Sequence, residues 1–203
     1  MFIGRSKELE TLEKLYHQNS FQFVVIYGRR RIGKTTLINE FIKGKKAVFY
    51  PSIDSNIKQN LELFSNSVLS SLTDIPVNTT FKNFEDIFEY IYQTAKNERF
   101  ILAIDEYPYL ANCYHGISSL LSAFIDHKFQ NSRLMLILCG SSLSFMENQV
   151  LGYQSPLYGR RTAQMKIAPF TYKECSQYYK NFERKELALA YGVTGGIPLY
   201  MSK

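Results

Sequence analysis

Three runs of almost wholly apolar residues set the strongest limit on how this chain can fold. They are FQFVVIY (21–27), FILAI (100–104) and LMLILC (134–139). A strand with one face in water alternates apolar and polar residues, so unbroken runs predict strands that are buried on both faces. Such strands belong to parallel sheets whose faces are covered by helices. The sequence therefore predicts an α/β fold with a central parallel sheet.

Segments with the helical spacing of apolar residues separate these runs. Helices are expected from a Ser6 N-cap to about His17, over 61–72, after an Asn83 N-cap, and over 117–125. A further strand is expected in KKAVFYPS (45–52), closed by Pro51, and a weaker one in QMKIA (164–168). Strands that alternate with helices in this way are typical of a doubly covered parallel sheet.

The character of the sequence changes beyond Pro169. Thr171 and Glu174 have the T-x-x-E spacing of a capping box, after which two short helices are expected. We therefore expect a core over residues 1–169 and the start of a smaller unit over residues 170–203. The chain stops in mid-element, just past Pro198, so we expect it to be a fragment of something longer.

The stretch YGRRRIGKTTL (27–37) carries the pattern Gly28-x4-Gly33-Lys34-Thr35 between a predicted strand and a predicted helix. Glycines allow successive backbone N–H groups to converge on an anion, and the helix adds its positive N-terminal end. The lysine can bridge the β- and γ-phosphates of a nucleotide, and the threonine hydroxyl can ligate Mg²⁺. The pattern thus predicts a Mg²⁺-nucleotide site. The remaining loop positions assigned to this site are Arg29, Arg30, Arg31, Ile32 and Thr36.

Two acidic residues follow the second apolar run. Asp105 comes directly after FILAI, and Glu106 is next. A carboxylate at the end of a neighbouring strand holds the metal of such a site, so we assign Asp105 to Mg²⁺. Glu106 is assigned to orienting or deprotonating an attacking water, as a general base.

Two further pairs of residues are candidates for the same site. Ser141 and Ser142 follow LMLILCG, where a hydroxyl can bond the γ-phosphate or the water, although a plain strand exit or helix cap explains them nearly as well. Arg160 and Arg161 can place a guanidinium on the transferred phosphate, or can lie in a solvated turn. The sequence alone does not decide either pair.

The bulk composition excludes other classes of protein. Of the 203 residues, 45% are hydrophobic and 21% are charged, which is typical of a globular protein. The N-terminal MFIGRSKELETL lacks the apolar stretch of a signal peptide, and no apolar run approaches the length of a membrane span. Cys113, Cys139 and Cys175 are far apart and form no C-x-x-C pair, so we expect buried thiols in a reducing, cytoplasmic setting.

Taken together, the motifs resemble the archaeal-type ATPases, P-loop proteins related to the AAA+ and STAND ATPases. The matching stretches run in the order of that family and span almost the whole chain. They are FIGRSKELETL, YGRRRIGKTTLINEF, FILAIDEYPYL, LILCGSSLSFM, SPLYGRRT with APF, and GVTGGIPLY. The resemblance implies a sheet in the order 5-1-4-3-2 and a small helical lid that begins near Phe170.

The resemblance also implies roles for individual residues. The Walker A residues of the family correspond to Gly28, Gly33, Lys34 and Thr35, and its Walker B aspartate and catalytic glutamate to Asp105 and Glu106. Its sensor-like polar residue falls on Ser141 or Ser142. Gly4 and Arg5 of FIGR would line the adenine pocket, and Gly196 and Pro198 of GGIP would place the lid near the nucleotide. Relatives often continue into a winged-helix region and a nuclease-like domain, which this sequence does not contain.

Three functions are consistent with these features. The leading hypothesis is a Mg²⁺-dependent ATPase whose nucleotide state switches the lid. The second is a nucleic-acid-binding module with ATP as a structural ligand. It is supported by the net charge of +6, Arg29 to Arg31, and Lys43, Lys45 and Lys46. Salt-dependent DNA binding without ATP would favour this hypothesis. The third is a signalling switch that forms homo-oligomers through the ATP site, with Arg160 or Arg161 reaching a neighbour. DNA and a protein partner are thus both left open.

Overall fold

Five parallel strands form the centre of the molecule, in the order β2-β3-β4-β1-β5. The structure is a computed structural model that describes residues 3–72 and 79–202. Its strands are β1 (Gln22–Tyr27), β2 (Ala47–Pro51), β3 (Phe100–Asp105), β4 (Leu134–Gly140) and β5 (Ala163–Lys166). Every residue of the three central strands β1, β3 and β4 is buried. The predicted parallel sheet and its order are confirmed.

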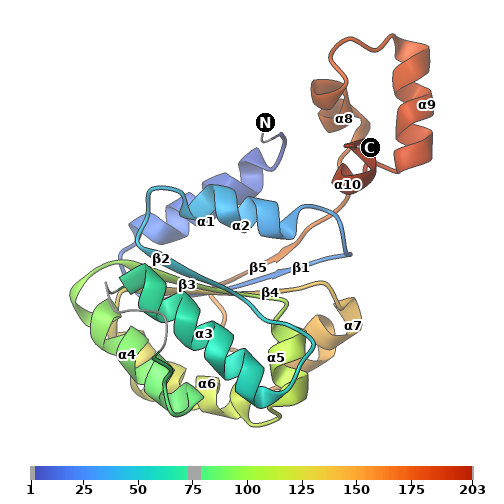
Figure 1. The fold of residues 1–203 in the computed structure, drawn as a ribbon. Helices are drawn as coiled ribbons and strands as arrows, with labels where there is room; N and C mark the ends of the chain where they lie inside the picture. Colours follow the sequence, from blue (N-terminus) through green and yellow to red (C-terminus); the bar gives the residue numbers. More distant parts are fainter. Residues whose placement is uncertain (1–2, 73–78, 203) are drawn as a thin grey trace.

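Helices cover both faces of the sheet (Figure 1). One face carries α1 (Ser6–His17) and α2 (Lys34–Ile42), and the other carries α3 (Ile57–Leu72), α4 (Phe84–Asn97), α5 (Tyr107–Cys113) and α6 (Ile117–His127). Successive residues of β1 point to opposite sides, so Val24 packs with Leu37 of α2 while Val25 belongs to the cluster with Phe64 of α3. Two separate apolar cores result, one on each side of the sheet.

Shorter elements complete the chain. A 3₁₀ turn (Phe129–Asn131) precedes β4, and α7 (Leu143–Phe145) with a π-helical turn (Met146–Val150) follows it. After β5 come α8 (Tyr172–Tyr178), α9 (Arg184–Thr194) and α10 (Pro198–Met201), which form a small helical unit, called the lid below, beside the carboxyl ends of the strands (Figure 1). The lid has three helices where the sequence predicted two. It has a small core of its own, made of Phe170, Cys175, Leu187 and Met201.

The helix caps test the local predictions one by one. The Asn83 side chain accepts a hydrogen bond from the Asp86 N–H, and Thr171 with Glu174 forms a complete capping box, as predicted. The predicted Ser6 cap is wrong. The N-cap of α1 is Arg5, whose φ of 61° is left-handed and whose side chain turns inward to bond carbonyl groups. The N-terminus of α1 therefore has no side-chain cap, and its N-cap residue is one whose guanidinium is buried.

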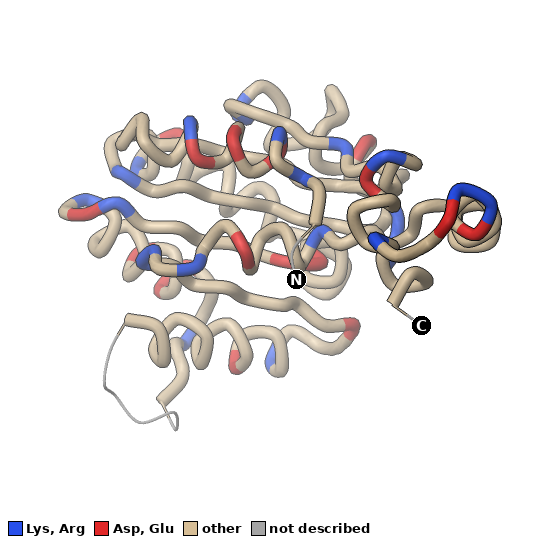
Figure 2. Tube along the Cα trace, turned by 90° about the horizontal axis from the view of Figure 1, so that it is seen from above, with Lys and Arg blue, Asp and Glu red and all other residues tan. Residues whose placement is uncertain are grey.

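Residues of both charge signs are interspersed along the helices and loops (Figure 2). The three lysines that the sequence offered for nucleic acid are all in ion pairs: Lys43 with Glu40, Lys45 with Glu13, and Lys46 with Glu98. Within residues 3–72 and 79–202, no helix is both long enough and apolar enough to cross a bilayer.

Within the lid, a tight contact around Gly196 joins the end of the segment to its start at Phe170. The Phe170 N–H donates to the Gly196 carbonyl at 2.8 Å, and the glycine has a φ of +69°. A Cβ atom at this position would lie 2.1 Å from the Phe170 carbonyl oxygen. Only glycine fits this approach of the two backbones.

We expect Gly196→Ala to destabilise the protein by about 1–3 kcal/mol, because the new methyl group meets backbone in a left-handed conformation. Thermal unfolding and limited proteolysis of the lid would measure the effect. Gly192→Ala is the matched control: its Cβ would meet no atom within 4 Å, and it lies inside α9, where alanine should stabilise by about 0.5–1 kcal/mol. Equal unfolding temperatures for the two variants would contradict the role given to Gly196.

Candidate functional site

The loop between β1 and α2 has the backbone of an anion cradle. Gly28 has a φ of 152° and Gly33, the N-cap of α2, a φ of 87°. A Cβ atom on Gly28 would lie 2.4 Å from the Ile167 carbonyl oxygen, so no larger residue fits there. Arg31 is left-handed as well, with a φ of 70°, an unusual conformation for a residue with a side chain. The loop thus wraps closely around the N-terminus of α2, which favours negative charge.

Lys34 supplies a buried positive charge at the centre of this loop. The residue is only 5% exposed, and its Nζ donates to the carbonyl groups of Gly28 at 3.1 Å and Arg29 at 2.9 Å. Among the described residues it forms no ion pair. Burial of a charge without a countercharge is costly, so the arrangement favours the binding of an anion.

Thr35 and Asp105 come together below the loop. The Thr35 hydroxyl donates to Asp105 Oδ2 at 2.6 Å, and Asp105 is 4% exposed. A hydroxyl and a carboxylate are hard oxygen donors of the type that Mg²⁺ takes, with water and phosphate as its other ligands. In the part of the chain that the structure describes, no group of three or more His, Cys, Asp or Glu side chains is arranged to hold a metal ion. The donors present therefore fit a Mg²⁺ ion that is carried in with phosphates.

Cys139 lies next to Asp105, on the adjacent strand β4. Burial, with the Asp105 carboxylate as the next cause, raises the pKa of the Cys139 thiol well above its usual value. The thiol therefore stays protonated and is not a nucleophile at neutral pH. It is fully buried behind the carboxylate and lines neither pocket of the site.

Glu106 is held by one of the two candidate serines. The backbone N–H of Ser141 donates to Glu106 Oε2 at 3.1 Å, and the Ser141 hydroxyl donates to the same oxygen at 2.7 Å. Ser142 is exposed and is the N-cap of α7 without a side-chain cap bond. Glu106 itself has a left-handed φ of 49° at the start of α5. Of the two serines, Ser141 is therefore the one at the site.

The three loop arginines point to different parts of the molecule. Arg29 is exposed, and its carbonyl accepts from Lys34. Arg30 contacts the core: Nη2 donates to the Tyr109 hydroxyl at 2.6 Å, and Nε lies 3.4 Å from Ser141 Oγ. Arg31 contacts the lid, where Nη1 donates to the Tyr200 hydroxyl at 3.2 Å. The arginine run is thus divided between core, lid and solvent.

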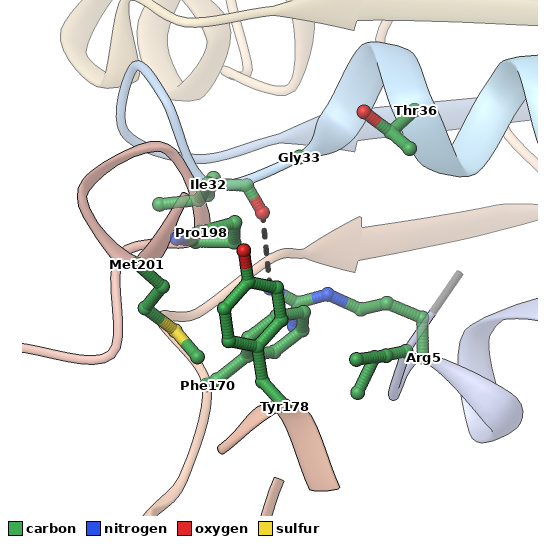
Figure 3. A pocket seen from close by; sticks show the side chains of 9 residues that line it. Arg5, Ile32, Gly33, Thr36, Phe170, Tyr178, Pro198 and Met201 are labelled. Carbon is green, nitrogen blue, oxygen red and sulfur yellow. Dashed lines mark hydrogen bonds between the residues drawn. The ribbon is translucent and has the colours of Figure 1, made fainter. Parts of the chain in front are cut away.

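Two pockets meet at the junction of loop and lid, and both are lined by Gly33, Thr36 and Pro198. The first pocket, of about 110 Å³, is mainly apolar (Figure 3). Its other lining residues are Ile3, Arg5, Ile32, Phe170, Tyr178 and Met201. The second pocket, of about 360 Å³, has a mixed lining that includes four charged residues, and it is called the polar pocket below. Its other lining residues are Arg30, Arg31, Lys34, Thr35, Glu106, Leu199 and Ser202.

Arg5 joins the wall of the apolar pocket to the loop and the lid. It is 5% exposed, and its Nη2 donates to the carbonyl groups of Ile32 at 3.1 Å and Ala168 at 2.6 Å (Figure 3). Its guanidinium lies 4.7 Å from the centre of the Phe170 ring. The buried Nε has no partner among the described residues, so the pocket retains one unused donor. An orphaned donor in an apolar wall fits a flat heterocycle with ring nitrogens, such as a purine.

The lid carboxylate Glu174 faces this same junction. Burial alone would raise the pKa of Glu174, but the N–H and hydroxyl of Thr171 and the charge of Arg5 lower it overall. Gly4 lies against this carboxylate, since a Cβ there would be 3.0 Å from Glu174 Oε1. Gly4 and Gly196 therefore shape the lid contact beside the pocket and are not among its lining residues. Phe2 of the same predicted segment lies outside the described residues.

Arg160 and Arg161 are not part of the site within this chain. They precede β5, whose pairing with β1 puts them at the amino ends of the strands, whereas Gly28 follows the carboxyl end of β1. Arg160 is also engaged, with a two-pronged ion pair to Asp126 at 2.7 and 2.6 Å. The expectation of a guanidinium from this pair applies, at most, to the site of a neighbouring molecule.

Several residues of the site had no signal in the sequence. Tyr109 and Tyr200 hold two of the loop arginines, and Tyr178 and Met201 line the apolar pocket. Of these residues, Tyr109 could most easily have been predicted from the sequence, because it lies in the first turn of α5, directly after Glu106. The lid residues come from a segment far along the chain, and only the folded structure brings them to the loop.

The fold and this arrangement of loop, acidic pair and lid define a P-loop nucleotide-binding ATPase domain. The family described as "ATPase domain predominantly from Archaea" matches residues 2–203, and the chain belongs to that family. The uncharacterized protein MJECL04 of Methanocaldococcus jannaschii is 32% identical over 203 residues, which make up 100% of this chain and 44% of that protein.

Solved structures show the same fold. The Walker-type ATPase PABY2304 of Pyrococcus abyssi matches with a TM-score of 0.68 at 20% identity, over 98% of this chain and 65% of its own. The ADP form of the Aeropyrum pernix ORC2 protein matches with a TM-score of 0.70 at 16% identity, over 99% of this chain and 61% of its own. This chain therefore spans less than two thirds of each of these relatives. The likeness to archaeal ATPases expected from the motifs is confirmed.

Proposed function

We propose that this domain binds Mg²⁺-ATP at the junction of core and lid and hydrolyses it to ADP and phosphate. The observation that carries the proposal is the pair of pockets that share Gly33, Thr36 and Pro198. The apolar pocket has the size and wall of a site for a purine base. The adjoining polar pocket contains the buried Lys34 and the acidic residue Glu106. A nucleotide that spans both pockets satisfies the orphaned Arg5 donor and the uncompensated lysine together.

The phosphate loop, Asp105 and Glu106 have separate tasks in this proposal. The backbone N–H groups of the loop and the ammonium of Lys34 bind the phosphates and stabilise the charge that develops on them. Thr35 and Asp105 hold Mg²⁺, which when bound neutralises charge on the phosphate oxygens. Glu106 accepts a proton from the attacking water, provided that its Oε2 is first released from Ser141. The water oxygen then forms a bond to the γ-phosphorus as the bond to ADP breaks.

The lid is proposed to respond to the nucleotide through Arg31 and α10. The Leu199 N–H lies 3.5 Å from the Arg31 carbonyl, and the Arg31 side chain contacts Tyr200. Pro198 is close enough to contact a Cβ on Gly33, at 3.8 Å. A change in the loop on binding or loss of the γ-phosphate therefore acts on the lid directly, which supports nucleotide-dependent switching of the lid.

Removal of Mg²⁺ tests the metal part of the proposal. We expect chelation by EDTA, or Asp105→Asn, to lower ATP turnover at least about tenfold, because Asp105 is the buried carboxylate beside the Thr35 hydroxyl. Steady-state phosphate release measures this. The control variant is Asp86→Asn, which makes the same isosteric change on the exposed surface of α4. Full turnover in EDTA, or in the Asp105 variant, would contradict a metal role.

Binding of DNA remains a weaker candidate for this chain. One neighbour at 15% identity is the Aeropyrum pernix ORC1 protein in complex with DNA, with a TM-score of 0.62. In this chain, however, the lysines that supported the idea are in ion pairs, and Arg30 and Arg31 contact tyrosines of the core and lid. The hypothesis of a homo-oligomeric switch needs an arginine that reaches a neighbouring molecule. That arginine would be Arg161, since Arg160 is held by Asp126. Neither alternative is favoured by a contact in the structure.

A further inference from the structure

Arg30 is exposed at the edge of the polar pocket and forms no ion pair with any described residue. Its side-chain partners among the described residues are the hydroxyl groups of Tyr109 and Ser141, and both are neutral. By contrast, Arg160 is paired with Asp126 and Arg5 contacts Glu8. A guanidinium held only by neutral acceptors exchanges them readily for an anion, because charge-assisted hydrogen bonds are about twice as strong.

Ser141 links Arg30 to Glu106. The Ser141 hydroxyl oxygen accepts a hydrogen bond from Arg30 Nε at 3.4 Å. The same hydroxyl donates to Glu106 Oε2 at 2.7 Å. Tyr109, the other partner of Arg30, belongs to the same turn as Glu106, since the Tyr109 N–H donates to the Glu106 carbonyl at 2.9 Å. A movement of Arg30 therefore changes the hydrogen bonding of the serine that holds the acidic residue.

We propose that Arg30 contacts the γ-phosphate of ATP within its own chain and thereby releases Glu106 from Ser141. The inference rests on the proposed function. A γ-phosphate in the polar pocket draws Arg30 away from Tyr109, and the Ser141 hydroxyl then turns its proton from Glu106 to a phosphate oxygen. Glu106 Oε2 then keeps only the hydrogen bond from the Ser141 N–H, and the lone pair that the hydroxyl occupied can accept a proton from water. ADP has no γ-phosphate, so it leaves Arg30 on Tyr109 and Glu106 on Ser141.

Two substitutions with opposite expected effects test this inference. Arg30→Gln should weaken binding of a non-hydrolysable ATP analogue about tenfold, change ADP binding less than twofold and lower turnover. Tyr109→Phe keeps the ring but frees Arg30, so binding of the analogue should be equal or up to about threefold tighter. A purely structural contact would make the two variants behave alike. Arg184→Gln removes one charge from the exposed start of α9 and is the control.

A spectroscopic measurement follows the release itself. The Ser141 amide donates to Glu106 Oε2, so its NMR signal should shift with the ATP analogue, should not shift with ADP, and should not respond to the analogue in Arg30→Gln. If a folded Arg30→Gln variant kept the wild-type preference for the analogue over ADP, this inference would be wrong, and the proposed function would be unaffected. Should Arg30→Gln fail to fold, looser analogue binding by Tyr109→Phe would overturn it. Failure of the wild-type chain to bind either nucleotide would overturn the proposed function as well.

Discussion

Lys34→Ala is expected to abolish most nucleotide binding while leaving the fold intact. The ammonium is buried, and its only described partners are two loop carbonyl groups. Loss of charge-assisted bonds to two phosphates should weaken ATP binding about 100-fold or more. The free energy of unfolding should be unchanged or higher, because the variant no longer buries an uncompensated charge.

Isothermal titration with ATP and thermal unfolding, run on the same samples, would separate the two effects. Lys7→Ala, in the exposed first turn of α1, is the matched control and should alter neither measurement. If Lys34→Ala bound ATP as tightly as the wild-type chain, the assignment of this loop to phosphate would be wrong. A large fall in stability would instead assign Lys34 a structural role.

Glu106→Gln should separate binding from hydrolysis. Glutamine has the same shape, and its amide oxygen can still accept the two hydrogen bonds from Ser141 that hold the glutamate. ATP affinity should therefore remain within about threefold of the wild-type value. Turnover should fall by about 10²–10⁴, since the amide cannot take a proton from water.

Binding and phosphate release, measured in parallel, decide this prediction. Glu85→Gln makes the same change on the exposed surface of α4 and should leave both values alone. Turnover of ATP by the Glu106 variant at the wild-type rate would show that this residue has no role in proton transfer. A variant that lost binding would show that its carboxylate supports the pocket itself.

The sequence was sufficient to predict the parts of the molecule that depend on local pattern. Unbroken apolar runs predicted the buried strands, and the glycine spacing predicted a loop whose Gly28 and Gly33 are both confirmed to need positive φ. Asp105 was predicted from its place at the end of a strand, because carboxyl ends of parallel strands meet at one edge of the sheet. The strand order came from the resemblance of the motifs.

The remainder of the site depends on contacts between distant residues. No spacing could show that Arg30 reaches Tyr109, or that Arg31 reaches Tyr200, since long flexible side chains have many alternatives until the backbone is folded. Ser141 and Ser142 are chemically identical neighbours, and only the direction in which β4 ends turns the first toward Glu106. From the sequence alone, Arg160 was a candidate for contact with the transferred phosphate. In the folded chain it forms an ion pair with Asp126 instead.

The separate small core of the lid has a consequence for how the protein can report on its ligand. Among the described residues, that core consists of four buried side chains with two partly buried tyrosines packed against them, so the lid is expected to open locally at a lower free energy than global unfolding. A nucleotide that binds only the docked lid adds about 2.7 kcal/mol to its closure at a hundredfold excess over the dissociation constant. The fraction of molecules with a closed lid would then rise with the concentration of ATP. The apolar surface beneath the lid would be covered in that fraction.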